Sequence, residues 1–200
     1  MWDLKVVKKK LQSIGKELKE QIQILAAVTL IFWVVFIIDR SFWNGNLSQF
    51  GIMPRRLIGL RGILFAPFLH GNFYHIASNT ASFLVLGWMV MLRNTNDFYF
   101  VSVFTAIASG LGTWLVGSPY SVHIGASGVI FGYFGYLLSR GYFEKSFVAI
   151  AISITIAMSY GSLIWGILPT RSYISWEGHL FGFIGGVLAA RILAAKTKIS

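Results

Sequence analysis

The chain has 200 residues, of which 56% are hydrophobic and 12% are charged, and this composition excludes an ordinary soluble domain. Its 17 basic residues outnumber its 7 acidic ones, but the bases cluster at the chain ends and between apolar runs, which is typical of a membrane protein and indicates no nucleic-acid partner. Cysteine is absent, so disulfides and thiolate metal sites are excluded, and no pattern implies a metal or an organic cofactor.

Six apolar runs dominate the chain. A helix needs about 20 residues to cross the roughly 30 Å hydrocarbon core of a bilayer. Five runs come near this length, and the fourth is shorter. The first run follows several lysines, as a signal peptide does, but no small-residue cleavage site comes after it. We therefore predict an all-α membrane protein with six transmembrane helices, at residues 22–38, 75–92, 98–116, 125–138, 147–168 and 179–195.

The basic residues predict the orientation of these spans. An even number of spans places both termini on one side, and that side carries 12 bases against 5 on the other. Since cytoplasmic segments carry the excess of Lys and Arg, both termini are expected in the cytoplasm. The 12 bases are Lys5, Lys8, Lys9, Lys10, Lys16, Lys19, Arg93, Arg140, Lys145, Arg191, Lys196 and Lys198.

Three segments lie outside the spans and need separate interpretations. Residues 1–21 are basic and partly amphipathic, which predicts a helix on the anionic inner surface of the membrane. Residues 39–74 are too long for a turn and too apolar for disorder, so we expect a structured first loop in the outer membrane interface. Residues 196–200 form a short cytoplasmic tail, which leaves 22–195 as one six-helix core.

Four polar residues are expected at one depth inside the membrane. His75 and Asn79 are four residues apart and share a face of the second span. Ser127 begins the fourth span and His179 begins the sixth. The alternating direction of the spans places all four near the outer side. Polar groups at such depth are costly and are typical of functional sites.

The fourth span sets the depth of this site. Fourteen helical residues reach only about 21 Å, roughly 9 Å less than the hydrocarbon thickness. If the inner end of the span is level with its neighbours, Ser127 lies below the outer surface and the preceding loop dips into the membrane. Irregular backbone is tolerated there only beside a protein-walled or water-filled cavity. Gly141 is expected in the turn after this span.

A serine near a histidine in a wet pocket indicates nucleophilic catalysis, in which the histidine takes the hydroxyl proton and the serine oxygen attacks a carbonyl. No aspartate is available near His179, and Glu177 lies on a different helical face, so a Ser–His dyad is the natural interpretation. Backbone amides at the start of the fourth helix, around Gly128, point at the developing oxyanion, and His75 and Asn79 could add donors.

Glycines on the fourth and sixth spans are expected to let the two helices meet. Gly128, Gly132 and Gly135 continue a stripe from Ser127, while Gly182 and Gly186 share a face with His179. Small residues allow membrane helices to approach closely. A hydrogen bond of roughly 2.6–3.2 Å between side chains of different helices needs this approach.

The motifs as a set resemble the rhomboid intramembrane serine proteases over about residues 22–195. "GASG" resembles the family's Gly-x-Ser-Gly motif, which runs here from Gly125 and implies Ser127 as nucleophile. "GHLFGFIGG" is similar to the family's His-x-x-Gly motif, which implies His179 as general base. "HGNFYHIASN" is similar to the second-helix motif, which implies oxyanion roles for His75 and Asn79 and a loop-organising role for His70.

The resemblance implies a serine endopeptidase of a bacterial inner membrane, with its site open to the outer face. Its partners would be transmembrane protein substrates and the lipid bilayer, and the oligomeric state stays open. Two alternatives also stay open. One is a rhomboid-like protein that binds transmembrane segments without cleaving them, and the other is a small channel or transporter. A transporter would more often show repeated halves with broken helices.

Overall fold

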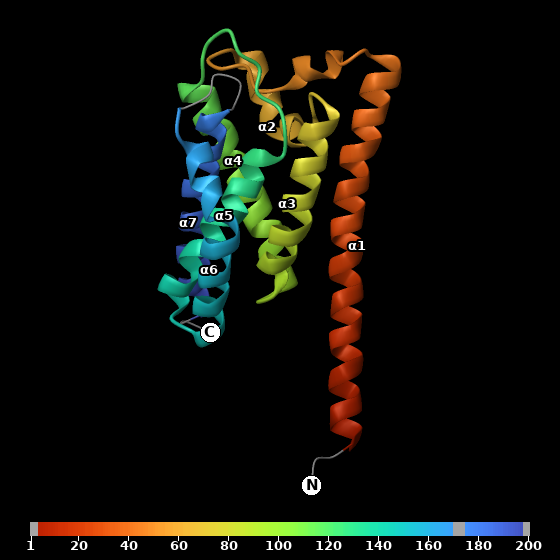
Figure 1. Cartoon of the computed structure of the whole chain (residues 1–200), viewed down its shortest axis with the longest axis vertical. Helices are drawn as coiled ribbons and strands as arrows, with labels where there is room; N and C mark the ends of the chain where they lie inside the picture. Colours follow the sequence, from red (N-terminus) through yellow and green to blue (C-terminus); the bar gives the residue numbers. More distant parts are fainter. Residues whose placement is uncertain (1–3, 170–174, 198–200) are drawn as a thin grey trace.

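The computed structural model describes residues 4–169 and 175–197. Within these ranges the chain is helical and no strand forms, as its long apolar runs predict. Figure 1 shows the long helices running side by side as one bundle. In chain order the elements are α1 (Leu4–Phe42), η1 (Asn46–Phe50), η2 (Leu57–Arg61), α2 (Gly62–Phe65), η3 (Ala66–Phe68), α3 (Phe73–Met91), α4 (Thr95–Val116), α5 (Ser127–Glu144), α6 (Phe147–Tyr160), η4 (Gly161–Ile167) and α7 (Trp176–Thr197).

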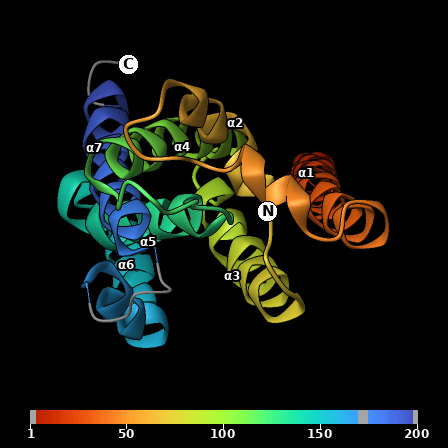
Figure 2. The same ribbon diagram turned by 90° about the horizontal axis from the view of Figure 1, so that it is seen from above.

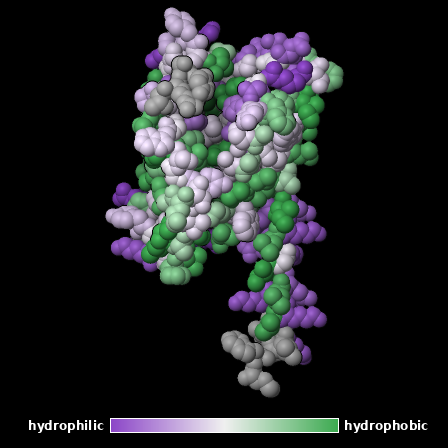
Figure 3. All heavy atoms as spheres, in the orientation of Figure 1, coloured by the Kyte–Doolittle hydropathy of each residue, from purple (hydrophilic) through white to green (hydrophobic). Residues whose placement is uncertain are grey.

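Four of the described helices are long and apolar enough to cross a membrane, at Val7–Phe42, Thr95–Val116, Phe147–Ile167 and Trp176–Lys196. The other two expected spans are also helical, with 19 residues in α3 and 18 in α5, but their polar residues make them less apolar. Figure 3 shows apolar side chains spread over the sides of the bundle and polar ones gathered towards its two ends. This distribution is typical of a protein that lies in a bilayer.

The N-terminal helix differs from the sequence prediction. α1 is one continuous helix of 39 residues, about 58 Å long. Figure 1 shows its N-terminal half running straight on beyond the lower ends of the other helices, so this half and the first span form one helix. No proline interrupts it, and Gly15 is accommodated within the helix. The apolar stripe of this half is exposed, and residues 1–3 lie outside the described ranges.

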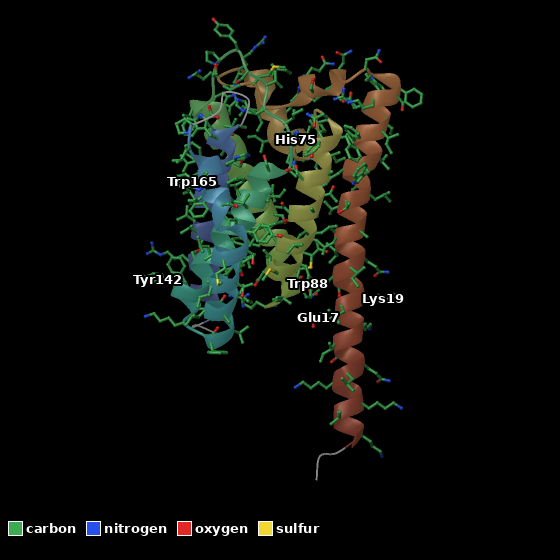
Figure 4. All side chains as sticks on the ribbon, in the orientation of Figure 1. Glu17, Lys19, His75, Trp88, Tyr142 and Trp165 are labelled. Atoms are coloured by element: carbon green, nitrogen blue, oxygen red, sulfur yellow. The ribbon has the colours of Figure 1, made fainter. Side chains whose placement is uncertain are left out.

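A buried polar contact fixes α1 to the C-terminal end of α3 and the start of α4. The Gln21 side chain is 4% exposed, accepts a hydrogen bond from Trp88 Nε1 at 3.2 Å and donates one to Thr95 Oγ1 at 3.1 Å. Figure 4 shows Trp88 on the inner part of α3, and Glu17 and Lys19 on α1 at the level where the other helices end. Above this contact, Leu25 and Phe32 are buried in the core.

The fourth span is longer than the sequence prediction, which ended it at residue 138. α5 continues to Glu144 because the charges of its last turns are paired. Glu144 Oε1 accepts from Arg140 Nε at 2.8 Å and from Arg93 Nη1 at 3.0 Å. Arg93 Nε also lies 2.7 Å from Asp97 Oδ2. Buried charges are tolerated when they are paired in this way, and the cluster joins the turn between α3 and α4 to the first turn of α4 and the last turns of α5.

The glycines of α5 and α7 bring the two helices into backbone contact. A Cβ at Gly182 would collide with the carbonyl oxygen of Gly128, and one at Gly186 with that of Gly132. Figure 2 shows α5 in the middle of the bundle, between α3, α6 and α7. Since only hydrogen atoms occupy these positions, the backbones approach more closely than any side chain would allow.

The connection between α1 and α3 is ordered as η1, η2, α2 and η3. It is held to later parts of the chain by its backbone. Arg55 N donates to Trp114 O at 2.9 Å, and Ile52 forms an isolated antiparallel bridge with His123. This connection therefore packs against α4 and against the loop that leads to α5.

Candidate active site

Ser127 and His179 face each other where α5 and α7 begin. Ser127 is the first residue of α5, and His179 lies in the first turn of α7. The distance between His179 Nε2 and Ser127 Oγ is 2.8 Å, although the residues are 52 positions apart in the chain. Gly182 lies about one turn after His179 on α7, and its close contact with Gly128, the residue after Ser127, allows this distance.

The His179 ring is held in one orientation from two sides. Its Nδ1 lies 2.9 Å from the carbonyl oxygen of Gly166 in η4, and its face stacks on Phe131 with 4.0 Å between the ring centroids. A carbonyl oxygen can only accept, so Nδ1 of the neutral ring carries the proton and donates it. Nε2 is then the unprotonated nitrogen, and it accepts the hydrogen bond from Ser127. This is the tautomer that a general base needs.

Ser127 lies well below the upper ends of the neighbouring helices in Figure 1. Figure 1 shows α5 beginning at a lower level than α3 and α4, with the chain of residues 117–126 descending to reach it. The first N–H groups of an α-helix have no intrahelical partner and carry a partial positive charge. At the start of α5 these groups belong to residues beginning with Ser127 and Gly128.

His75 and Asn79 converge on the backbone just before Ser127. A Cβ at Gly125 would lie 2.5 Å from His75 Nε2 and 3.3 Å from Asn79 Nδ2. Gly125 also has a φ of 114°, which side-chain-bearing residues rarely adopt. Figure 4 shows His75 near the outer end of α3, beside the start of α5. The two side chains thus approach the backbone beside Ser127 only because this position is a glycine.

The amide of Asn79 has an unused donor. The side chain is 6% exposed, and its Nδ2 has no hydrogen-bond partner within the described part of the chain. A buried donor without a partner is costly. Its position beside Gly125 makes it available to an oxygen bound next to Ser127.

A cleft of about 780 Å³ opens beside the Ser–His pair. Its volume lies in the range of small-molecule and peptide pockets. Besides the residues above, its walls come from the loop before α5, from α3 and from η4. They include Ser78, Ser82, Val122, Ile130, Ser162 and Leu163. Among the described residues, no group of three or more His, Cys, Asp and Glu side chains could hold a metal ion.

His70 packs behind the site. Its ring lies 5.1 Å from that of His75 and 5.4 Å from that of Phe32, measured between centroids, and the side chain is 3% exposed. Burial lowers the pKa of His70 to about 4, so its ring is neutral at pH 7. The ring of His70 therefore packs between α1 and α3.

Three residues of the site carry no signal in the sequence. Phe131 and Gly166, which hold the His179 ring, look like ordinary apolar and small residues of a membrane segment. The third is His123, which lies in the loop before α5, and both of its ring nitrogens lie within hydrogen-bond distance of serine hydroxyls, those of Ser121 and Ser175.

Comparison with known proteins gives a consistent result. Residues 58–196 match the sequence model of the rhomboid domain. The uncharacterized protein Rv1337 of Mycobacterium tuberculosis is 38% identical over 183 residues, covering 88% of this chain and 75% of that protein. YdcA of Bacillus subtilis, whose full name is "Putative rhomboid protease YdcA", is 30% identical over 181 residues, covering 87% of this chain and 88% of that protein. RHOMBOID-like protein 5 of Arabidopsis thaliana is 30% identical over 167 residues, covering 76% of this chain and 51% of that protein.

Proposed function

This chain is an integral membrane protein of the rhomboid family, and we propose that it is a serine endopeptidase that hydrolyses peptide bonds in or next to transmembrane segments. The observation that supports this most directly is the 2.8 Å contact of Ser127 Oγ with an oriented His179. A nucleophile, its base and an unused buried donor meet at the floor of one cleft. Binding of a transmembrane segment without cleavage would not require this combination.

The proposed reaction begins when His179 Nε2 takes the proton of Ser127 Oγ and the oxygen attacks the scissile carbonyl. The resulting oxyanion is stabilised by Asn79 Nδ2, by His75 and by the N–H groups around Gly128. His179 then donates its proton to the leaving amine, and the C–N bond breaks to give an acyl-enzyme. A water molecule attacks the ester carbonyl with His179 again as base, and this step releases the acid product and restores Ser127.

The proposed substrate is a membrane protein, because the cleft has walls made of membrane-spanning helices. Ser78 and Ser82 of α3 line one side, and Ser162 and Leu163 of η4 line the other. Figure 2 shows α3 to the right of α5 and α6 below it, so the two helices flank α5. A segment that unwinds between them would reach Ser127 from the bilayer, while the polar lining would admit the water needed for hydrolysis.

A fluorophosphonate probe tests the proposal. The purified protein in detergent should form an adduct at Ser127 Oγ with loss of fluoride, detected by mass spectrometry. It should also cleave some members of a panel of single-span membrane proteins. If the protein binds a transmembrane segment but is not labelled and does not cleave it, the alternative of a rhomboid-like protein that only binds such segments is supported instead. If the protein is not labelled and binds no segment, a channel or transporter is favoured.

Replacing the proposed oxyanion donors should slow turnover without removing the nucleophile. Loss of one such donor costs about 2.7–4 kcal/mol, or roughly 10²–10³-fold in rate. We expect kcat of Asn79→Ala and His75→Ala to fall within this range, and labelling of Ser127 to persist at a lower rate. Ser82→Ala, on the same helix and cleft, should cleave at the wild-type rate. Wild-type turnover by both donor variants would contradict the assignment.

We also propose a six-span topology in a bacterial inner membrane, in which the core of residues 22–195 follows a cytoplasmic segment 1–21 and ends in a cytoplasmic tail 196–200. In this arrangement the connection of residues 43–72 lies at the outer interface, and the site opens outward. The charge distribution of 12 bases against 5 supports this orientation, although Arg171 and Lys198 lie outside the described residues.

Reporter fusions test this topology. Alkaline phosphatase, which is active only after export, should be inactive when fused after Ser200 and active when fused after Gly45. The expected reason is that α1 places Gly45 on the outer side while the remaining spans return the chain to the cytoplasm. The reverse pattern would overturn both the orientation and the outward-facing site.

A further inference from the structure

His123 joins three segments that meet at the candidate active site. Its Nδ1 lies 2.6 Å from Ser175 Oγ, and its Nε2 lies 2.7 Å from Ser121 Oγ. Its own backbone is fixed independently of the ring, because His123 N donates to Ile52 O and Ile52 N donates to His123 O, both at 2.9 Å. The imidazole is therefore a side chain on a firm support, with its Nδ1 edge turned to the start of α7.

Ser175 is the residue that makes this contact important. It directly precedes α7, and its carbonyl oxygen accepts from the backbone N of His179 at 3.2 Å. A displacement of Ser175 would therefore move the first turn of the helix that carries the base. The contact with His123 therefore holds Ser175 at the N-terminal end of α7.

Other contacts hold the N-terminal turns of α7 from different sides. Ser109 Oγ of α4 donates to Gly178 O at 2.8 Å, and Gly182 touches the backbone of Gly128 on α5. His123 acts from the loop that leads to the nucleophile, only four residues before Ser127. His123 thus connects the loop that leads to Ser127 with the start of the helix that carries His179.

We propose that His123 is a positioning residue that holds the first turn of α7 through Ser175 and so sets the approach of His179 to Ser127. The catalytic consequence of this proposal rests on the proposed function. The contact between His123 and Ser175 does not depend on that function. It predicts that the Nδ1 side of the ring matters and that the Nε2 side, which contacts Ser121 within the same loop, matters little.

Two isosteric replacements separate the two sides of the ring. An asparagine amide can take the place of Nδ1 and keep the bond to Ser175, whereas a glutamine amide reaches the place of Nε2 and keeps the bond to Ser121. We expect His123→Ala and His123→Gln to lower kcat about 10-fold, which is part of the roughly 10²-fold cost of a 1 Å misplacement, with KM unchanged. His123→Asn should recover most of the rate.

The serine variants complete the experiment. Ser175→Ala should reproduce the loss of His123→Ala, the double variant should be no slower than either single one, and Ser121→Ala should be near wild type. Labelling of Ser127 by a fluorophosphonate should follow the same order. Melting temperatures should stay at the wild-type value, because a role in global stability would lower them together with the rate.

Hydrogen exchange supplies a measurement that does not depend on activity. In His123→Ala and Ser175→Ala, amides in the first turn of α7 should exchange faster, while those of α6 should not change. Equal rates for His123→Asn and His123→Gln, or wild-type labelling and exchange in His123→Ala, would overturn the proposal. If the wild type is neither labelled nor active, the proposed function fails, and the exchange result alone decides whether the tether exists.

Discussion

Ser127→Ala and His179→Ala will each give a folded membrane protein that does not cleave its substrates. The expected loss of kcat is at least about 10⁴-fold, because removing either group removes the attacking oxygen or the acceptor of its proton. Groups that act as a unit are not additive, so the double variant should be no slower than either single one. Cleavage of one single-span substrate, measured with purified protein, checks all three.

Ser162→Ala is the matched control for this experiment. Ser162 lies in η4 and lines the same cleft, so its replacement makes the same chemical change without touching the Ser–His contact. It should cleave at nearly the wild-type rate. Clear turnover by purified Ser127→Ala would disprove the mechanism, whereas a loss in Ser162→Ala as well would show that the cleft tolerates no hydroxyl removal.

Much of the fold and of the candidate site could be predicted because a membrane makes polar residues conspicuous. Each of the six apolar runs lies largely within a described helix. Ser127 and His179 stand out as polar side chains at the starts of such runs, and the structure brings them within 2.8 Å. The glycine pattern predicted that α5 and α7 meet, and the backbone contact of Gly182 with Gly128 agrees.

What could not be predicted depends on contacts between distant segments. The inner end of α5 was placed too early because Arg140 and Glu144 look like residues of a polar turn until Arg93 is seen to pair with Glu144. Gly141 was expected in that turn, but it lies in α5, where a Cβ would be 2.8 Å from Ser153 Oγ of α6. His123 gave no signal, because its partners Ser121 and Ser175 are ordinary serines.

The structure also changes what can be concluded about α1. Hydropathy separates residues 1–21 from the span, but helix propensity does not, since neither proline nor a capping sequence interrupts the segment. One continuous helix results, and its polar half leaves the bundle along the same axis (Figure 1). α1 therefore separates from the bundle near a side-chain contact, that of Gln21 with Trp88, and not at a break in the backbone.

Gly182→Val should abolish cleavage, because Gly182 is where the helix of the base rests on the helix of the nucleophile. A Cβ at this position already collides with Gly128 O, so the first turn of α7 must move away from α5. A displacement of about 1 Å can cost roughly 10²-fold in rate. The valine side chain needs a larger displacement than the single carbon of alanine. We expect Gly182→Ala to lose about 10²-fold in kcat and Gly182→Val to show no measurable turnover.

Gly161→Ala is the control, since a Cβ at Gly161 meets nothing within 4 Å and its backbone is right-handed. It should keep wild-type cleavage and melting. Gly182→Ala covers the possibility that the valine variant does not fold, because it adds one carbon and should still yield a folded protein whose labelling at Ser127 is slow. If Gly182→Ala folds and cleaves like Gly161→Ala, then contact between these two backbones does not set the distance from His179 to Ser127.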